Sequence, residues 1–321
     1  INTVLIAMYG ATIGACSILA TEAATNQACA AFLPNKEVDS SYLYYFLCSK
    51  RSEFVSMGVG GAQPNISATI LKGVKIPLPP LEIQKQIAQT LDTTAELLSM
   101  CKQQLEELNN LIKSTFYAMF GDPVTNEKGW KTKQLSSCCI MNPRKSELSC
   151  LKDDLQVSFV PMQLVSENGE IDSTQIREYK DVCTGFTYFF EEDVLFAKIT
   201  PCMENGKGAI ARNLSNNIGF GSTEFHVLRP IEGVSNSEWL FRLTTLPVFR
   251  KDAEKNMSGS AGQKRVPTSF FSKFVVPVPP ISLQNQFAEI VTKIEEQKAL
   301  VKKGINETQH LFDSLISQYF E

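Results

Sequence analysis

The 321-residue sequence has few of the side chains that build common catalytic and metal sites. It contains two histidines, His226 and His310, and its nine cysteines include no pair with CxxC spacing. Because a structural zinc site takes closely spaced Cys and His ligands, we expect none here. An odd number of unpaired cysteines is typical of a reducing compartment, and we interpret the thiols as packing side chains.

Long hydrophobic runs and a strong net charge are also absent. The apolar stretch from Val4 to Ala20 is interrupted by Gly10 and Gly14, and no Lys or Arg precedes it. We therefore expect neither a signal peptide nor a membrane helix, and we predict a cytoplasmic protein with no membrane partner. The formal charge of -3 excludes binding of nucleic acid by bulk charge, so any such binding must use local basic patches.

The usual catalytic motifs are missing too. The sequence contains no GxxxxGK[ST], HExxH or GxSxG, and no GxGxxG that opens a helix after a strand. Neither histidine has a paired acid or nucleophile nearby in the sequence, which favours a structural role over a catalytic one for both. We predict that the chain is not an enzyme and binds no metal and no cofactor of its own.

What the sequence does contain is an internal repeat. The string IPLPPL at residues 76–81 matches VPVPPI at 276–281, and the register then holds without a gap as far as Phe120 and Phe320. Upstream, VLIA at 4–7 aligns with VLFA at 194–197. Self-similarity of this length indicates two copies of one structural module.

A proline-rich arm and a long helix are predicted in each copy. Proline favours extended backbone, so the arms cannot be helical. After each arm, apolar residues recur every three or four positions and form one narrow stripe, which predicts two long helices that pair as an antiparallel coiled coil. Matching stripes would also allow pairing between two chains, so self-association stays open. The residues expected in the helix packing are Ile87, Leu91, Leu98, Leu105, Phe287, Val291, Ile294 and Ile305.

The remaining sequence predicts globular, mostly β domains. Short β-rich runs broken by Gly, Asn and Pro occur at 157–160, 188–190, 194–197 and 225–228, and a short helix is expected at 237–246 with a counterpart at 42–47. The predicted fold class is therefore α+β, with two modules that each consist of a mixed globular domain and a long helix. The expected boundaries of globular domain, arm with helix, globular domain and arm with helix are 1–76, 77–122, 123–276 and 277–321.

The two copies differ in length. Residues 121–190 of the second copy have no counterpart ahead of Ile1. We therefore expect the first globular domain to lack its initial part, either because the natural chain is longer or because this variant is truncated.

Two loops of the second copy suit contact with nucleic acid. Residues 250–265 read RKDAEKNMSGSAGQKR, with five basic residues against two acidic ones, and residues 198–208 offer further donors. Lys and Arg neutralise phosphates, while Gln, Asn and Arg can bond to base edges. A solvated surface loop and a plain hairpin connection explain the same residues equally well. The candidate DNA-binding residues are Lys198, Asn205, Lys207, Ser260, Gly262, Gln263, Lys264 and Arg265, with Gln63 and Asn65 in the first copy.

Three strings carry a family resemblance. They are DVLFAKITPCMENGKGAIA at 193–211, IGFGSTEFHVLRP at 218–230 and GSAGQKRVPTSFFSKFVVPVPP at 259–280. The first copy has weaker versions: VLIAMYGATIGA, TNQACAAFLP and GGAQPNISATILKGVKIPLPP. Together with the repeat, they resemble the specificity subunit of type I restriction-modification systems over essentially the whole chain.

The resemblance implies a function and a set of partners. It implies two target-recognition domains that each read half of a bipartite site in double-stranded DNA, and helices that fix the distance between the halves. Methyltransferase subunits that use S-adenosylmethionine and ATP-dependent restriction subunits that use Mg2+ would be the partners, with no catalytic residue in this chain. The alternatives are a coiled-coil scaffold that binds only protein, or an inactive remnant without sequence-specific DNA binding.

Overall fold

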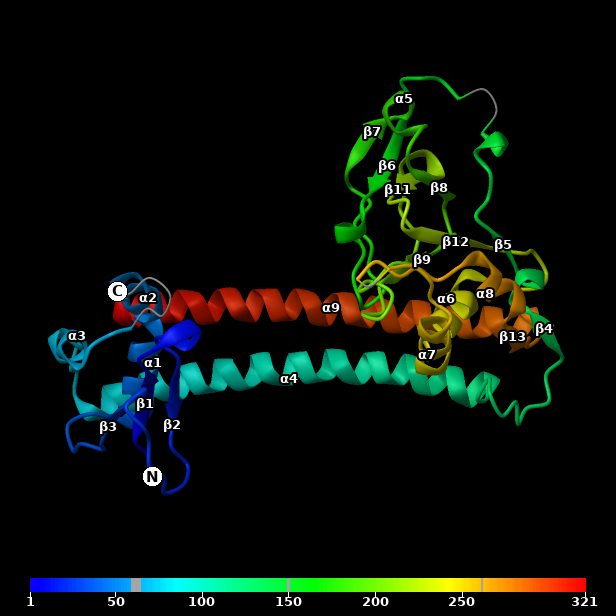
Figure 1. Ribbon diagram of the computed structural model, residues 1–321. Coiled ribbons are helices and arrows are strands. Elements are labelled where there is room, and N and C mark those ends of the chain that lie inside the picture. The colour runs from blue at the N-terminus through cyan, green and yellow to red at the C-terminus, as the bar shows by residue number, and fades with distance from the viewer. Residues whose placement is uncertain (59–64, 149–150, 261) are drawn as a thin grey trace. The chain divides into compact units, whose positions relative to one another are not determined.

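The computed structural model describes residues 1–58, 65–148, 151–260 and 262–321 (Figure 1). Its contacts divide the chain into a first unit, residues 1–107 and 297–321, and a second unit, residues 108–296. The long helices α4 (Leu81–Phe120) and α9 (Ile281–Phe320) contribute residues to both units. Each helix starts directly after a proline-rich arm, as the apolar spacing predicts.

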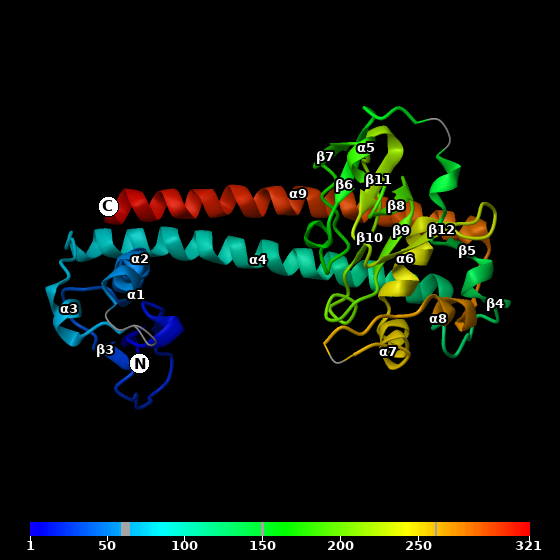
Figure 2. The same cartoon turned by 45° about the horizontal axis from the view of Figure 1, so that its top comes forward.

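The first unit combines a small sheet with helices. Strands β1 (Val4–Ala7), β2 (Cys16–Ile18) and β3 (Cys29–Phe32) form an antiparallel sheet in the order β2-β1-β3. Helices α1 (Ser40–Ser49), α2 (Arg51–Met57) and α3 (Ala68–Gly73) follow (Figure 2). Their core includes Leu91 from the start of α4 and Phe320 from the end of α9. The two helices therefore run antiparallel within this unit.

The second unit contains two four-stranded sheets. The first has the order β10-β9-β12-β5, all antiparallel, and the second has the order β7-β6-β11-β8, in which β6 and β11 are parallel. A separate pair joins β4 to β13. The strand bounds are β4 Thr132–Gln134, β5 Cys139–Met141, β6 Gln156–Val160, β7 Ile176–Glu178, β8 Thr187–Phe190, β9 Val194–Ala197, β10 Gly208–Ile210, β11 Ile218–Gly221, β12 Phe225–Pro230 and β13 Val275–Pro277.

Among the described residues of the second unit, four short α-helices accompany the sheets. They are α5 (Tyr179–Val182), α6 (Ser237–Thr245), α7 (Pro247–Lys255) and α8 (Thr268–Lys273). The core contains Trp239 of α6 and Phe271 of α8, and it also takes in Phe120 of α4 and Phe287 of α9, whose rings lie 5.2 Å apart. The end of α4 thus meets the start of α9, which is again antiparallel. The predicted strands and the short helix at 237–246 are confirmed, and so is the α+β class with two modules.

A buried glutamine shows the repeat at atomic detail. Gln284 accepts from the backbone N–H of Asn236 at 3.0 Å and donates to the Pro279 carbonyl at 2.9 Å. Gln84 accepts from the N–H of Asp39 at 3.0 Å and donates to the Pro79 carbonyl at 2.9 Å. Asp39 and Asn236 in turn cap the N-termini of α1 and α6. Each module therefore ties its arm, its long helix and its short helix together with the same side chain.

The residues expected in helix packing differ in burial. Leu91, Phe287, Val291 and Ile294 are buried, whereas Ile87, Leu98, Leu105 and Ile305 are half-buried. The sequence-based domain boundaries stay a prediction, because both units take in parts of the long helices. Within the described parts of the chain, no helix has the length and apolar character needed to cross a membrane.

Candidate nucleic-acid interface

Two loops of the second unit are joined through their backbones. Loop A, residues 198–207, connects β9 to β10, and loop B, residues 256–267, connects α7 to α8. The N–H of Val266 donates to the Lys198 carbonyl at 2.9 Å, and the N–H of Thr200 donates to the Lys264 carbonyl at 3.0 Å. These bonds bring together all of the candidate residues that the sequence placed in the second copy. We call the two loops the loop pair.

Loop B ends in a small hairpin. Ser258 and Arg265 exchange two backbone hydrogen bonds, at 3.0 and 2.8 Å. Gly259 and Gly262 lie at φ values of 127° and 84°, which residues with a side chain rarely adopt. The hairpin therefore requires glycine at both positions. It presents the candidate residues Ser260, Gly262, Gln263 and Lys264 as exposed groups.

A buried arginine, Arg250, holds loop A through hydrogen bonds to its backbone carbonyls. Arg250, 8% exposed, donates to the carbonyls of Met203 at 3.0 Å, Gly206 at 3.2 Å and Thr244 at 2.7 Å. Its guanidinium also lies 4.3 Å from the centre of the Phe196 ring. Burial lowers the pKa of Arg250 to about 10, so the side chain is still charged at neutral pH. Arg250 thereby fixes the backbone beside the candidate residues Asn205 and Lys207.

This arrangement corrects one expectation from the sequence. Residues 250–265 do not form a single basic loop, because residues 247–255 form α7. Arg250 is enclosed in the protein and cannot contact a ligand at the surface. The charge that remains near the loop pair comes from Lys198, Lys207, Lys264 and Arg265, against the carboxylates of Glu204 and Glu224.

The positive charges differ in how far they are compensated. Arg265 forms a two-pronged ion pair with Glu224, at 2.8 Å between Nη2 and Oε1 and 2.9 Å between Nε and Oε2. The pair raises the pKa of Arg265 and lowers that of Glu224. Lys207 donates to the Met162 carbonyl at 3.4 Å. Among the described residues no carboxylate forms an ion pair with Lys264, which is exposed at the hairpin.

A histidine supports the loop pair from the sheet. Nε2 of His226 lies 2.8 Å from the Val266 carbonyl, and Nδ1 lies 3.2 Å from the side-chain amide of Asn142. Burial lowers the pKa of His226, which favours the neutral ring. The network assigns the proton to Nε2, which donates to Val266, so that Nδ1 accepts from Asn142. Both nitrogens are satisfied, and this geometry gives His226 a structural role.

The described residues of the first unit repeat one hydrogen bond and one β-bridge of the loop pair. The N–H of Ile66 donates to the Met8 carbonyl at 2.9 Å, which corresponds to the bond from Val266 to Lys198. An isolated antiparallel β-bridge joins Tyr9 to Asn65, and its counterpart in the second unit joins Ile199 to Arg265. The candidate residue Asn65 is exposed there. Gln63, the other candidate of the first copy, lies outside the described residues.

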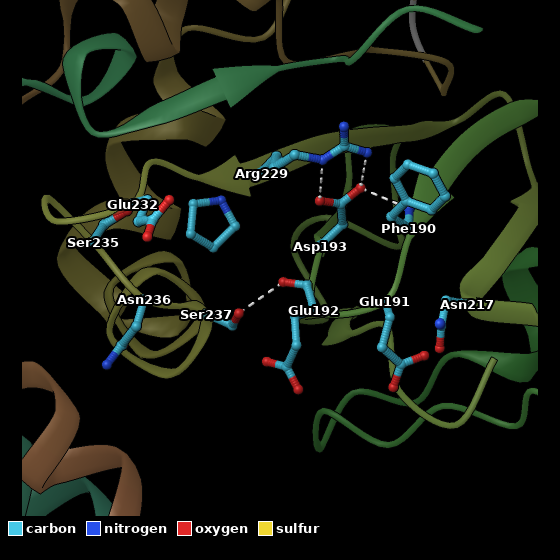
Figure 3. Close-up of a pocket in the computed structure, with 11 residues that line it drawn as sticks. Phe190, Glu191, Glu192, Asp193, Asn217, Arg229, Glu232, Ser235, Asn236 and Ser237 are labelled. Carbon is cyan, nitrogen blue, oxygen red and sulfur yellow. Dashed lines mark hydrogen bonds and ion pairs between the residues drawn. The ribbon is translucent and has the colours of Figure 1, made fainter. Parts of the chain in front are cut away.

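A cavity of the second unit lies at a different place, and acidic residues form much of its wall. Its volume is about 650 Å³, and its walls include Glu191, Glu192, Asp193 and Arg229 (Figure 3). Both oxygens of Asp193 accept from Arg229 at 2.8 Å, and Glu191 accepts from the backbone N–H groups of residues 213 and 214 at 2.8 and 2.9 Å. Figure 3 also shows that Ser237 donates to the Glu192 carbonyl. These carboxylates stabilise the turn between β8 and β9.

Comparison with known families agrees with the repeated fold. A family model described as "Type I restriction modification DNA specificity domain" matches residues 1–110 and 127–309. The chain belongs to this family. Within the type I DNA specificity family, the chain is 35% identical over 193 residues to the type I restriction enzyme EcoAI specificity subunit of Escherichia coli, which covers 59% of the chain and 32% of that relative. It is 34% identical over 203 residues to the EcoEI specificity subunit of the same species, with 61% and 33% covered.

The chain thus spans about a third of the length of these two members of the type I DNA specificity family. A longer alignment, 26% identical over 301 residues, covers 84% of the chain and 66% of the MjaVIII specificity subunit of Methanocaldococcus jannaschii. The crystal structure of a type I restriction-modification system S subunit from M. genitalium has a similar fold, with a TM-score of 0.58 at 17% sequence identity. The match covers all of this chain and 83% of the M. genitalium chain. That likeness concerns the fold alone.

Proposed function

We propose that this chain is a DNA sequence-specificity subunit of a type I restriction-modification complex, in which each loop pair reads one half of a bipartite site in double-stranded DNA. The observation that carries the proposal is the repetition of the loop pair. The bridge between residues 199 and 265 in the second unit has its equivalent between residues 9 and 65 in the first. A protein with two equivalent loop pairs suits a target with two half-sites, and membership of a DNA specificity family supports this assignment.

The side chains of the loop pair divide into two chemical classes. Lys264 and Lys198 are cations suited to phosphate oxygens, which position a protein on DNA without reading sequence. Gln263 and Asn205 are exposed amides that can bond in two places to the edge of adenine. The proposed recognition therefore combines backbone contacts by lysines with base contacts by amides.

The proposed partners follow from the relatives. These are described as specificity subunits of type I restriction enzymes, so other subunits belong to those enzymes. We assign methylation to methyltransferase subunits with S-adenosylmethionine, and cleavage to restriction subunits with ATP and Mg2+, in the cytoplasm. In the described part of this chain, no group of three or more His, Cys, Asp or Glu side chains could hold a metal. The chain would thus direct the chemistry without performing it.

The proposal is tested by selecting DNA duplexes from a randomised pool with the purified chain and sequencing the bound fraction. We expect enrichment of two short sequence elements separated by a fixed distance. Replacing Gln263 with Ala should relax the preference at one base position by about 1–3 kcal/mol. Replacing Lys264 with Ala should weaken binding to all sequences and reduce the salt slope by about 0.9.

A matched control is Lys128→Ala, which removes an exposed lysine from the loop after α4. It should leave both the selected sequence and the salt slope unchanged. Enrichment of no sequence by the original chain would contradict the proposal. An equal effect of the Lys128 and Lys264 variants would remove the loop pair from the interface.

A further inference from the structure

Two cysteines of the first unit lie on elements that pack together, strand β2 and helix α1. Cys16 begins β2 opposite Ile6 of β1, so both side chains point to the same face of the sheet. Ile6 is fully enclosed in the core that this sheet shares with α1. Cys16 therefore points toward α1, and it packs against the core as a half-buried side chain.

Cys48 approaches the same place from the last turn of α1. It is half-buried, and Cα atoms of α1 and β2 come within 8 Å of each other. The loop before β2 also reaches the start of α2, because a side chain on Gly14 would come within 3.0 Å of Cγ of Arg51. Arg51 follows Cys48 by three positions. These contacts bring both thiols and a positive charge to one place.

A hydrogen bond joins the two thiols. Sγ of Cys16 has two acceptors within reach, the sulfur of Cys48 and the Gly14 carbonyl at 3.5 Å. Cys48 also accepts a hydrogen bond from the hydroxyl of Tyr44, one turn earlier in α1. Cys48 thus accepts from two donors beside the charge of Arg51, an arrangement that favours its thiolate.

The two thiols are consequently unequal. Their hydrogen bond is the main cause that lowers the pKa of Cys48 and raises the pKa of Cys16, which burial raises further. The hydroxyl of Tyr44 and the charge of Arg51 also lower the pKa of Cys48, against the effect of its burial. Because the thiolate is the nucleophile, Cys48 is expected to react first, while Cys16 keeps its proton beside it.

The thiol pair belongs to the first copy of the repeat alone. By strand register Gly208 occupies the position of Cys16 in the second unit. A side chain on Gly208 would come within 3.4 Å of Nη2 of Arg250, the residue that holds loop A. Counted from the capping residues of α1 and α6, Thr245 occupies the position of Cys48. The second unit therefore has a buried arginine where the first has two thiols.

We propose that Cys48 and Cys16 form a peroxide-reactive thiol pair, in which Cys48 is oxidised first and Cys16 then closes a disulfide between α1 and β2. An activated thiol with a second thiol next to it is the arrangement of redox-sensing cysteines. In a reducing compartment such a bond forms transiently, and small-molecule thiols reverse it. The inference does not depend on DNA binding.

The two steps balance in atoms and electrons. The Cys48 thiolate attacks one oxygen of hydrogen peroxide, the O–O bond breaks, and the leaving hydroxide takes the proton that Cys48 released to form water. The Cys16 sulfur attacks the resulting sulfenic acid, the S–O bond breaks, and the second hydroxide leaves as water with the Cys16 proton. The two sulfurs lose two electrons, and one peroxide gives two molecules of water.

The disulfide would restrain the loop that precedes β2. A disulfide needs Cα atoms within about 7 Å of each other, which the packing of α1 against β2 permits. Residues 8–15 connect β1 to β2 and correspond to loop A, and Tyr9 of this loop bridges Asn65. Oxidation would therefore fix the first unit's equivalent of the loop pair.

The test treats the whole reduced chain with a small excess of hydrogen peroxide at neutral pH. Remaining thiols are then blocked with N-ethylmaleimide under denaturing conditions, and tryptic peptides are mapped by mass spectrometry. Cys48 is alone in the peptide of residues 37–50, whereas Cys16 shares the peptide of residues 1–36 with Cys29, so Cys29→Ser is treated in parallel. We expect the cross-link between these two peptides as the main product in both proteins.

Further variants separate the roles of the two thiols. In Cys16→Ser the sulfenic acid of Cys48 should persist and react with dimedone, whereas in Cys48→Ser the oxidation of Cys16 should be at least about tenfold slower. Arg51→Met should slow the oxidation of Cys48 at least about threefold, because its positive charge favours the thiolate. Cys101→Ser is the control, because Cys101 is half-buried on α4 of the same unit and should leave the rate unchanged.

Three outcomes would overturn the inference. The first is the absence of a cross-link between the peptides of residues 1–36 and 37–50. The second is a dimedone adduct on Cys16 of the Cys48→Ser variant that forms as fast as the adduct on Cys48 of the Cys16→Ser variant. The third is an oxidation rate of Cys48 that Arg51→Met leaves unchanged, although circular dichroism shows that the variant folds.

Discussion

The two units share one backbone hydrogen bond and one β-bridge between equivalent loops, and they differ in the side chains beside them. In the second unit Arg265 pairs with Glu224, and His226 supports the bridge from β12. In the first unit, Asn65 occupies the position of Arg265. By strand register, Ala28 occupies the position of Glu224, and Ala30 occupies the position of His226. The backbone contact between the loops is therefore the same in both units, while the charge of the candidate interface depends on a few side chains that differ between them.

The clearest difference between the two units is the residue that holds loop A, because the first unit has no arginine at the position of Arg250. Arg250 follows the buried Phe249 in α7, whereas Val55, 55% exposed, follows the buried Phe54 in α2. Replacing Arg250 with Met should lower the free energy of unfolding of the second unit by about 3 kcal/mol, because buried carbonyls lose their donor. Urea unfolding followed by tryptophan fluorescence measures this, since Trp130 and Trp239 both lie in the second unit.

The matched control for Arg250 is Val55→Met in the first unit. It should change the tryptophan transition by less than about 0.5 kcal/mol, because the side chain is exposed. A loss below about 1 kcal/mol for Arg250→Met would mean that Arg250 does not anchor loop A.

Substitution of the buried glutamines Gln84 and Gln284 should have the same effect in both units, because their hydrogen bonds are equivalent. Replacing Gln284 or Gln84 with Ala leaves the backbone N–H of Asn236 or Asp39 without its acceptor, at a cost of about 1–3 kcal/mol in each case. Hydrogen exchange followed by mass spectrometry should show faster exchange at the start of α6 in one variant and of α1 in the other. Faster exchange in only one of them would show that the two joints are not equivalent.

The third expected effect concerns pH. The pKa of His226 is lowered in the folded protein, so the unfolded state binds more protons as pH falls below the ordinary value of 6.5. The second unit should therefore lose stability from about pH 7 downward, until the pH passes the lowered pKa. Urea unfolding at pH 7.5 and 5.5 should show this loss in the original chain. It should shrink in His226→Gln and persist in the control His310→Gln, because His310 is exposed on α9.

The smallest expected change in stability comes from the ion pair. Glu224→Gln should cost less than about 1 kcal/mol, because the pair with Arg265 is partly exposed. In the original chain this contribution is present above the ordinary pKa of Glu224 and is lost as pH falls through the lowered one. If the loop pair binds DNA, the freed Arg265 should increase the salt slope by about 0.9, measured by titration at several salt concentrations. An unchanged slope would show that Arg265 does not reach phosphate.

Local signals predicted much of this structure. Proline arms followed by a three-to-four spacing predicted α4 and α9, and β-rich runs predicted β6, β8, β9 and β12. Comparison of the two copies also placed the candidate residues of loop A and loop B in equivalent strings. These features depend on near neighbours in sequence, or on the repeat itself.

Tertiary contacts account for what the sequence did not reveal. Arg250 stands in the string RKDAEK, which has the composition of a solvated surface, and its acceptors Met203 and Gly206 lie more than 40 positions away. Glu224 lies 41 positions from Arg265, so no local pattern indicates their pair.

The bridge between residues 199 and 265 joins loop A to loop B through main-chain atoms alone. The exposed side chains of the two loops take no part in this connection. If these residues contact DNA, as we propose, substitutions at Gln263, Lys264 or Asn205 would change the contacts with DNA and leave the main-chain hydrogen bonds between the loops in place.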